Sequence, residues 1–312
     1  MSKKLISFIV PVFNEEDNAV PLAAKIGEVM RPFAERYDYE LIFTDNRSED
    51  RTWKTIVELS HKDDHVRAFR FSRNFGYQRS IFTGYTKAKG DCAVQLDCDF
   101  QDPPELIPEF IKHWEDGAKV VYGVRRSRQE AWWINLMRHA FYRLIDSLSE
   151  DKLPLDAGEF RLVDRRAIDE LLKIEDYSPY LRGAIATLGF KQVGVPYDRA
   201  ARERGVSKFG FGALVGLALD GILSHSVLPL RIATYTGLLI SSLTFLALVG
   251  YGSAKIFFNV PMPAGWATTT IFILLSLSVN SIFFGVIGEY LGRMYRQMKR
   301  RPLVIIDESI ER

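Results

Sequence analysis

The first 125 residues alternate between short apolar runs and amphipathic segments, and this alternation constrains the fold more than any other feature. The apolar runs predict strands at residues 5–12, 39–44, 66–71, 92–96 and 120–122. The segments between them have helical periodicity and predict helices at residues 17–31, 48–62 and 78–89, the second with Ser48 or Asp50 as its N-cap. Strands and helices in this order predict an α/β domain whose mostly parallel sheet is covered on both faces.

Polar and acidic residues follow three of these strands. The first strand ends in Asn14-Glu15, the second in Asp45-Asn46-Arg47-Ser48, and the fourth in the segment 97–102, which reads Asp-Cys-Asp-Phe-Gln-Asp. Open sheets of this kind bind their ligands at the carboxyl ends of the strands. We therefore expect the three acidic clusters to meet in one crevice, and this convergence carries more weight than any single motif.

Asp97 and Asp99 flank one residue at the end of an apolar strand. Side chains at positions i and i+2 of a strand point the same way, so the two carboxylates would repel each other unless a cation lay between them. Oxygen ligands favour Mg²⁺ or Mn²⁺ over zinc. A cation held there would bridge the diphosphate of a nucleotide-sugar and neutralise the leaving group. The alternative is a pair of solvated turn carboxylates.

Asp45 and Glu15 each allow two interpretations. A carboxylate at the end of the second strand can accept hydrogen bonds from a base or a ribose. It can equally serve as an N-cap for the helix that follows, where Asp is common. Glu15 and its neighbour Asn14 have the same ambiguity, and we favour a functional role because of the acidic clusters nearby.

Two groups of basic residues are typical of phosphate-binding sites. Guanidinium groups match phosphate oxygens well, and we favour a role in the site for Arg125 and Arg202, together with the cationic Lys208. A basic face can also lie against anionic lipids. That second interpretation is the one we favour for the remaining members, which are Arg126, Arg128 and Arg199.

An acidic pair, Asp156 and Glu159, lies on what reads as a glycine-containing loop. Either residue could orient the acceptor or act as a general base. A salt bridge from Glu159 to Arg161 or Arg165 is an equally good explanation. A phosphate acceptor is already an anion, so the chemistry does not demand a strong base.

Two long apolar stretches, 232–251 and 268–288, each suffice to cross a bilayer of roughly 30 Å. Arg231 precedes the first, and a basic segment that ends at Arg301 follows the second, so the positive-inside rule places both ends in the cytoplasm. Amphipathic segments at 130–148 and 207–226 are expected at the membrane interface. The predicted order is then a cytoplasmic domain at 1–200, an interfacial region at 201–229, a transmembrane hairpin at 230–292 and a basic cytoplasmic tail at 293–312, in the inner (plasma) membrane.

Charge and cysteine content argue against several other classes of protein. A formal net charge of +2 over 312 residues argues against a nucleic-acid-binding protein. The two cysteines, Cys92 and Cys98, lie on one predicted strand, which makes a disulfide framework or a zinc site implausible. Reduced cysteines suit a cytosolic domain.

At these residues the chain resembles the inverting family-2 glycosyltransferases, and it is most similar to the branch that acts on polyprenyl phosphates. That branch includes dolichol-phosphate mannose synthases and bacterial undecaprenyl-phosphate glucosyltransferases. The resemblance covers nearly the whole chain, and its combination of motifs is specific. The matching segments are residues 10–15, 43–48, 95–105, 156–161 and 202–209.

The resemblance implies a GT-A fold, a nucleotide-sugar donor and inversion of the sugar in a single displacement. It assigns the nucleotide to Pro11, Phe13, Glu15, Asp45 and Asp97, and the metal and diphosphate to Asp97, Asp99 and Gln101, with Mg²⁺ or Mn²⁺ as cofactor. Basic residues near the diphosphate and the acceptor phosphate correspond to Arg125 and Arg202, with Lys208 nearby. The chain departs from the family where Asn46-Arg47 replaces Asp-Gly and where Glu159 replaces Asp.

The substrates follow from the same resemblance. A UDP-sugar, with glucose first, is the expected donor, while GDP-mannose or a modified amino sugar stays open. Undecaprenyl phosphate is the expected acceptor, and a homo-oligomer such as a tetramer is plausible for a two-helix anchor. Three rivals are weaker: a processive polysaccharide synthase, which would need a Gln-x-x-Arg-Trp motif and more spans, a non-catalytic membrane scaffold, and a small transporter.

Overall fold

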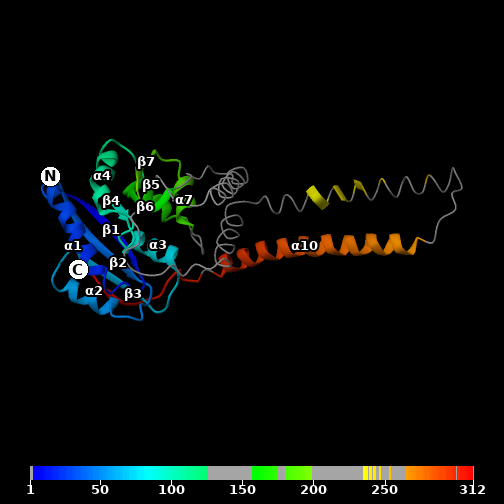
Figure 1. Ribbon diagram of the computed structural model, residues 1–312, viewed down its shortest axis with the longest axis horizontal. Coiled ribbons are helices and arrows are strands. Elements are labelled where there is room, and N and C mark those ends of the chain that lie inside the picture. Colours follow the sequence, from blue (N-terminus) through cyan, green and yellow to red (C-terminus); the bar gives the residue numbers. More distant parts are fainter. Residues whose placement is uncertain are drawn as a thin grey trace. The chain divides into compact units, whose positions relative to one another are not determined.

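The computed structural model describes residues 3–125, 157–174, 180–198, 265–299 and 301–311, together with scattered positions between 235 and 253. The chain divides into two compact units. The first comprises Met1–Leu214 and Arg301–Arg312, and the second comprises Val215–Arg300. The first unit contains the sheet and the helices that cover it, and the second contains α10 (Trp266–Met298) (Figure 1).

The first unit is built on an eight-stranded mixed sheet with the order β7-β5-β6-β4-β1-β2-β3-β8. The strands are β1 (Lys4–Val12), β2 (Tyr37–Asp45), β3 (Val66–Phe71), β4 (Cys92–Gln95), β5 (Val120–Arg125), β6 (Ala157–Asp164), β7 (Gln192–Tyr197) and β8 (Ile306–Ile310). β1 runs parallel to β2 and β4, as do β2 to β3 and β5 to β7. β6 lies antiparallel between β4 and β5, and β8 lies antiparallel along β3.

The expectation of a mostly parallel sheet is therefore only partly right. The four strands formed by the first 95 residues are parallel to one another, as their alternation with helices predicts. The departure comes from β6 and β8, which enter the sheet from later parts of the chain. Those later segments, and β7 with them, were not among the predicted strands.

Helices cover both faces of the sheet, as predicted. α1 (Ala19–Met30), α2 (Thr52–Ser60) and α4 (Ile107–Glu115) pack on one face, against the side chains of Phe8 and Val10. The other face is covered by α3 (Tyr77–Lys87), α6 (Arg165–Leu171) and α7 (Leu181–Thr187), which pack against Ile9 and Ile42. Two short 3₁₀ turns, η1 (Arg31–Phe33) and η2 (Pro104–Leu106), precede β2 and α4. Alternate residues of β1 thus supply two separate cores.

The predicted N-caps of the second helix are wrong. α2 begins at Thr52, with Arg51 at the N-cap position and no capping side chain on that residue. Asp50 lies outside the helix, and its carboxylate accepts a hydrogen bond from the Thr52 amide at 2.9 Å. The four residues before Thr52 belong instead to a loop that Asp45 organises, as described below. The two cysteines are free and buried, in agreement with the expected reduced state.

The second unit, Val215–Arg300, includes both of the predicted membrane-spanning stretches. The amphipathic segments 130–148 and 207–226 lie outside the described residues, and most of 232–251 does as well. The stretch 268–288 lies within α10. Within the part of the chain that the structure describes, no helix has both the length and the apolar character needed to cross a membrane.

Candidate active site

The carboxyl ends of three neighbouring strands are marked by backbone in the left-handed region. Asn14 after β1, Arg47 after β2 and Phe100 after β4 have φ angles of 57°, 65° and 57°. Residues other than glycine rarely adopt this conformation, and it costs free energy that the surrounding structure must offset. Such positions cluster at functional sites, and here they lie at the edge of the sheet where the sequence predicted a crevice.

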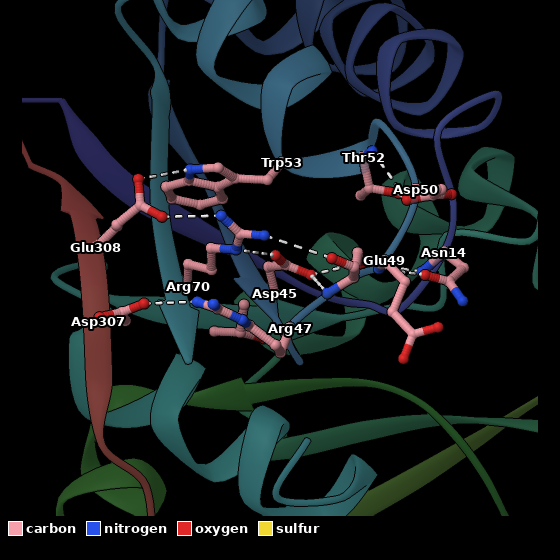
Figure 2. A network of polar contacts seen from close by, with 12 residues as sticks. Asn14, Asp45, Arg47, Glu49, Asp50, Thr52, Trp53, Arg70, Asp307 and Glu308 are labelled. Atoms are coloured by element: carbon pink, nitrogen blue, oxygen red, sulfur yellow. Dashed lines mark hydrogen bonds and ion pairs between the residues drawn. The ribbon is translucent and has the colours of Figure 1, made fainter. Parts of the chain in front are cut away.

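Asp45 organises the loop that follows β2 (Figure 2). Its side chain is fully buried, and Oδ1 accepts hydrogen bonds from the amide and the hydroxyl of Ser48 at 2.9 and 2.6 Å. The same hydroxyl accepts a hydrogen bond from the Asn14 amide at 2.9 Å, which joins the β1 and β2 loops. Burial raises the pKa of Asp45, while Ser48 and Arg70 oppose the increase. Asp45 therefore does not cap α2, which begins seven residues later.

Asp97 and Asp99 lie in the turn after β4 and not on the strand itself. The alternation rule used to aim the two carboxylates in the same direction therefore does not apply. Asp99 Oδ1 accepts a hydrogen bond from the Gln101 amide at 3.2 Å, within that turn. The Tyr77 hydroxyl donates a hydrogen bond to Asp97 Oδ1 at 2.5 Å.

The electrostatics of Asp97 indicate a local excess of negative charge. Burial, together with the nearby carboxylates of Asp102, Asp99 and Glu159, raises the pKa of Asp97 to about 7, against the opposing effect of the Tyr77 hydrogen bond. A cation near Asp97 would relieve this repulsion and favour the ionised carboxylate.

The residues present fit a divalent cation that is bound together with a substrate. Among the described residues, no three His, Cys, Asp or Glu side chains gather closely enough to hold a metal ion by themselves. Mg²⁺ commonly takes one or two carboxylates and completes its shell with water and substrate phosphates. Asp97 and Asp99, with the amide side chain of Gln101 in the same turn, match that donor set.

Glu159 is on strand β6, and the predicted glycine-containing loop is wrong for the residues from Ala157 onward. Its carboxylate pairs with Arg161 at 3.2 Å and with Arg182 at 3.1 Å, which confirms the alternative of a salt bridge to Arg161. Burial opposes ionisation of Glu159, but the two guanidinium groups and Gln78 together hold its pKa below the ordinary value. A carboxylate so stabilised is a weak base, which argues against a role in proton abstraction.

Arg125 ends strand β5 and faces a second buried acid. Its Nη2 lies 3.9 Å from Asp102 Oδ1, and its Nε donates to the Tyr197 hydroxyl at 3.4 Å. Tyr197 in turn donates a short hydrogen bond to Asp102. Arg125 is thus held on the same side of the sheet as the carboxylates, where a phosphate group could reach its guanidinium.

The remaining predicted residues fall into two groups. Pro11 lies within β1 opposite Thr44, Phe13 is 40% exposed, and the Glu15 carboxylate accepts a hydrogen bond from the Asn18 side chain at 2.6 Å. These three residues and Gln101 lie at or near the same strand ends as Asp45 and Asp97. Outside the described residues are Asp156, Arg202 and Lys208, and also Arg126, Arg128 and Arg199.

Three contributors to the site were missed from the sequence: Tyr77, Arg182 and Tyr197. Tyr77 begins α3 just after the end of β3, so the strand-end rule applied to that strand would have found it. Arg182, on α7, and Tyr197, at the end of β7, belong to elements that the sequence did not predict. No local signal identified them.

Comparison with known proteins decides the family. The sequence profile of glycosyl transferase family 2 matches residues 7–172, which include the strand-end loops and Glu159. The chain belongs to glycosyl transferase family 2. It is 38% identical over 304 residues to the uncharacterized glycosyltransferase YkcC of Bacillus subtilis, covering 97% of this chain and 93% of that one. It is 36% identical over 318 residues to the bactoprenol glucosyl transferase of Shigella phage SfII, covering 97% and 98%.

A solved structure supports the GT-A-like fold. The mannosyltransferase PcManGT from Pyrobaculum calidifontis, in complex with GDP-Man and Mn²⁺, aligns with a TM-score of 0.50 over 96% of this chain and 87% of its own. The two sequences are 15% identical, so the likeness concerns the fold alone. The chain is accordingly a family-2 glycosyltransferase related over nearly its full length to bactoprenol glucosyl transferases.

Proposed function

We propose that this enzyme transfers glucose from UDP-glucose, with inversion at the sugar, to the phosphate of a polyprenyl lipid such as undecaprenyl phosphate. The observation that carries the proposal is the arrangement at the strand ends. In the sheet, β1 separates β2, which Asp45 ends, from β4, which Asp97 and Asp99 follow. Arg125 adds a cation 3.9 Å from Asp102, in the segment that follows Asp99. Relatives that are 36% identical over nearly the full length carry the name bactoprenol glucosyl transferase, which supports this donor and acceptor.

The donor is expected to bind across the ends of β1, β2 and β4. The nucleoside would lie against Pro11, Phe13 and Glu15, where the half-exposed Phe13 ring offers an apolar surface. Asp45 would accept a hydrogen bond from the base or the ribose. A divalent cation on Asp97, Asp99 and Gln101 would supply charge neutralisation for the diphosphate leaving group.

Bringing an acceptor phosphate up to a donor diphosphate is an electrostatic problem that cations solve. Arg125 lies beside the carboxylate cluster, and we assign Arg202 and Lys208 to the acceptor phosphate as well. The phosphate oxygen attacks the anomeric carbon from the face opposite the leaving group, and the bond to the diphosphate breaks. Because the acceptor is already an anion, no residue needs to remove a proton, in keeping with the ion-paired state of Glu159.

A lipid acceptor requires access to a membrane. We propose that residues 230–292 anchor the chain, that both ends lie in the cytoplasm and that the chain forms an oligomer such as a tetramer. The segment from 256 to 288 contains no charged side chain, which supports the anchor. Carbonate extraction of membranes tests it, because an anchored chain stays in the pellet and a peripheral one is released.

A transfer assay tests the function directly. Purified protein would receive undecaprenyl phosphate, Mn²⁺ or Mg²⁺, and a panel of radiolabelled UDP- and GDP-sugars. We expect glucose label to enter the lipid phase, and we expect Asp99→Ala and chelation with EDTA each to abolish the transfer. Hydrolysis of a donor without lipid labelling would discard the acceptor, and full activity in EDTA would discard the metal. Label from another donor alone would replace glucose.

A further inference from the structure

The C-terminal strand β8 carries carboxylates that reach basic residues of the donor domain. Asp307 pairs with Arg47 at 2.5 Å, Glu308 with Arg70 at 2.8 Å, and Glu311, just beyond the strand, with Lys87 at 3.3 Å. β8 is far from the donor loop in sequence but forms one edge of the sheet, antiparallel to β3, which is itself the neighbour of β2. In Figure 2 the strand stands beside the loop that follows β2.

We propose that Glu308 is a positioning residue of the donor site, which acts through Arg70 on Asp45 and so sets the affinity for the nucleotide. This inference rests on the proposed function, because it takes Asp45 as part of the nucleotide site. It adds Glu308, from the C-terminal strand, to a nucleotide site whose predicted residues all lie within the first 101 positions.

Glu308 fixes the Arg70 guanidinium with both of its oxygens engaged. Oε1 accepts a hydrogen bond from Arg70 Nη1 at 2.8 Å, and Oε2 accepts one from the indole Nε1 of Trp53 at 3.0 Å. The guanidinium also lies 5.7 Å from the centre of the Trp53 ring, a cation–π distance. Arg70 is therefore held between a carboxylate and an aromatic ring.

The same guanidinium faces the donor loop on its other side. Nη2 donates to the carbonyl oxygen of Ser48 at 3.4 Å, and Nε lies 3.4 Å from Asp45 Oδ2. Oδ1 of Asp45 is engaged by Ser48, whereas the fully buried Oδ2 accepts no hydrogen bond from the described residues. Oδ2 thus faces the Arg70 guanidinium, and the position of Arg70 determines the charge beside the Asp45 carboxylate.

A second contact from β8 stabilises the same loop. Arg47 has a φ of 65°, and its side chain extends to Asp307 (Figure 2). The left-handed conformation costs free energy for any residue with a Cβ atom, so Arg47 needs contacts that hold it there. Consecutive residues of β8 therefore hold two points of one loop, at Arg47 and, through Arg70, at Asp45.

The experiment compares Glu308→Gln with Glu311→Gln in the full-length protein. Both changes remove one negative charge from the C-terminal segment, but Glu311 pairs with Arg67 and Lys87 and not with Arg70. UDP binding with Mn²⁺ would be measured by calorimetry, and the kinetics of transfer from UDP-glucose would be measured alongside. For Glu308→Gln we expect UDP to bind about tenfold more weakly and KM to rise by the same factor, with kcat within about twofold. Glu308→Asp should recover part of the loss, and Glu311→Gln should match the wild type.

The outcomes separate this inference from the function beneath it. Wild-type affinity in a folded Glu308→Gln variant, or equal losses in both variants, would overturn the role of Glu308. A wild-type protein that binds neither UDP nor UDP-glucose would instead overturn the proposed donor. If Glu308→Gln does not fold, Trp53→Phe removes one hydrogen bond from Glu308 and should raise KM about threefold. An unchanged KM in that variant would also count against the proposal.

Discussion

The Tyr77 hydroxyl donates a 2.5 Å hydrogen bond to Asp97 Oδ1, and so joins the start of α3 to the turn after β4. Tyr77 follows β3, which is separated from β4 by two strands, β1 and β2, in the sheet. The contact therefore spans the donor site from one strand end to another. It orients a carboxylate whose pKa is raised by burial and by the neighbouring negative charges.

Replacing Tyr77 by Phe should weaken the metal site without unfolding the domain. The carboxylate of Asp97 loses the hydrogen bond that favours its charged form, so a cation must compete with a higher proton affinity. We expect the Mn²⁺ concentration for half-maximal transfer to rise about three- to tenfold. Tyr37→Phe is the matched control, because Tyr37 gives a similar hydrogen bond to Glu115 at the start of β2. Equal metal dependence in both variants would contradict the role of Tyr77.

Glu159→Gln should reduce stability more than it reduces chemistry. The change leaves Arg161, which is 3% exposed, without its buried anionic partner, and we expect a loss of about 2 kcal/mol in the free energy of unfolding. The transfer rate per folded molecule should fall less than about tenfold, because this carboxylate is not needed as a base. A loss of several orders of magnitude in kcat, with the fold intact, would reinstate Glu159 as a base.

The stabilising effect of Glu159 should depend on pH in a known direction. Its pKa in the folded protein lies below the ordinary value of 4.5, so the folded state binds its proton more weakly than the unfolded state. The stability advantage of the wild type over Glu159→Gln should be complete above about pH 5 and should decline as the pH falls below 4.5. Chemical unfolding of both proteins at a series of values from about pH 3.5 to about pH 7 measures how the difference in their stability changes. A constant difference across the range would refute the assignment.

Glu40→Ala should destabilise the domain from the opposite end of the sheet. Glu40 is buried and receives hydrogen bonds from Ser7 at 2.6 Å, from Arg67 at 2.5 Å and from the amide of Lys89 at 2.7 Å. Removing one member of a buried ion pair leaves the other charge uncompensated, at a cost of about 3–5 kcal/mol. Glu28→Ala, which breaks the exposed pair with Lys25, should cost less than about 1 kcal/mol. Chemical unfolding followed by tryptophan fluorescence compares the two.

Gly84→Ala should also destabilise the domain, because α3 packs closely on β1 at that position. A Cβ atom on residue 84 would lie 2.2 Å from Cγ2 of Ile9. Overpacking of this kind costs about 1–3 kcal/mol. In an Ile9→Ala background the obstructing atom is absent, so the two losses should be less than additive. Full additivity in unfolding measurements would show that the loss in Gly84→Ala does not come from the contact with Ile9.

The sequence by itself determined the local part of this protein. Apolar runs and helical periodicity are local signals, and they predicted the five strands up to Arg125 and the three helices between the first four of them, but not α4. The strand-end rule then placed Asp45, Asp97 and Asp99 at one edge of the sheet, because the carboxyl ends of parallel strands meet there. Motif resemblance gave the family that the sequence profile confirms.

Only the tertiary structure decided which partners these residues have. β6 and β8 enter the sheet across long stretches of chain, and no local pattern states that Ile306–Ile310 pairs with β3 or that Glu308 contacts Arg70. No local pattern states either that Arg182 contacts Glu159, and this contact shows that the candidate base is an ion-paired carboxylate. Such contacts depend on packing between segments distant in sequence. Ionisation follows from burial and neighbouring charge, so the state of each carboxylate could be assigned only in the folded chain.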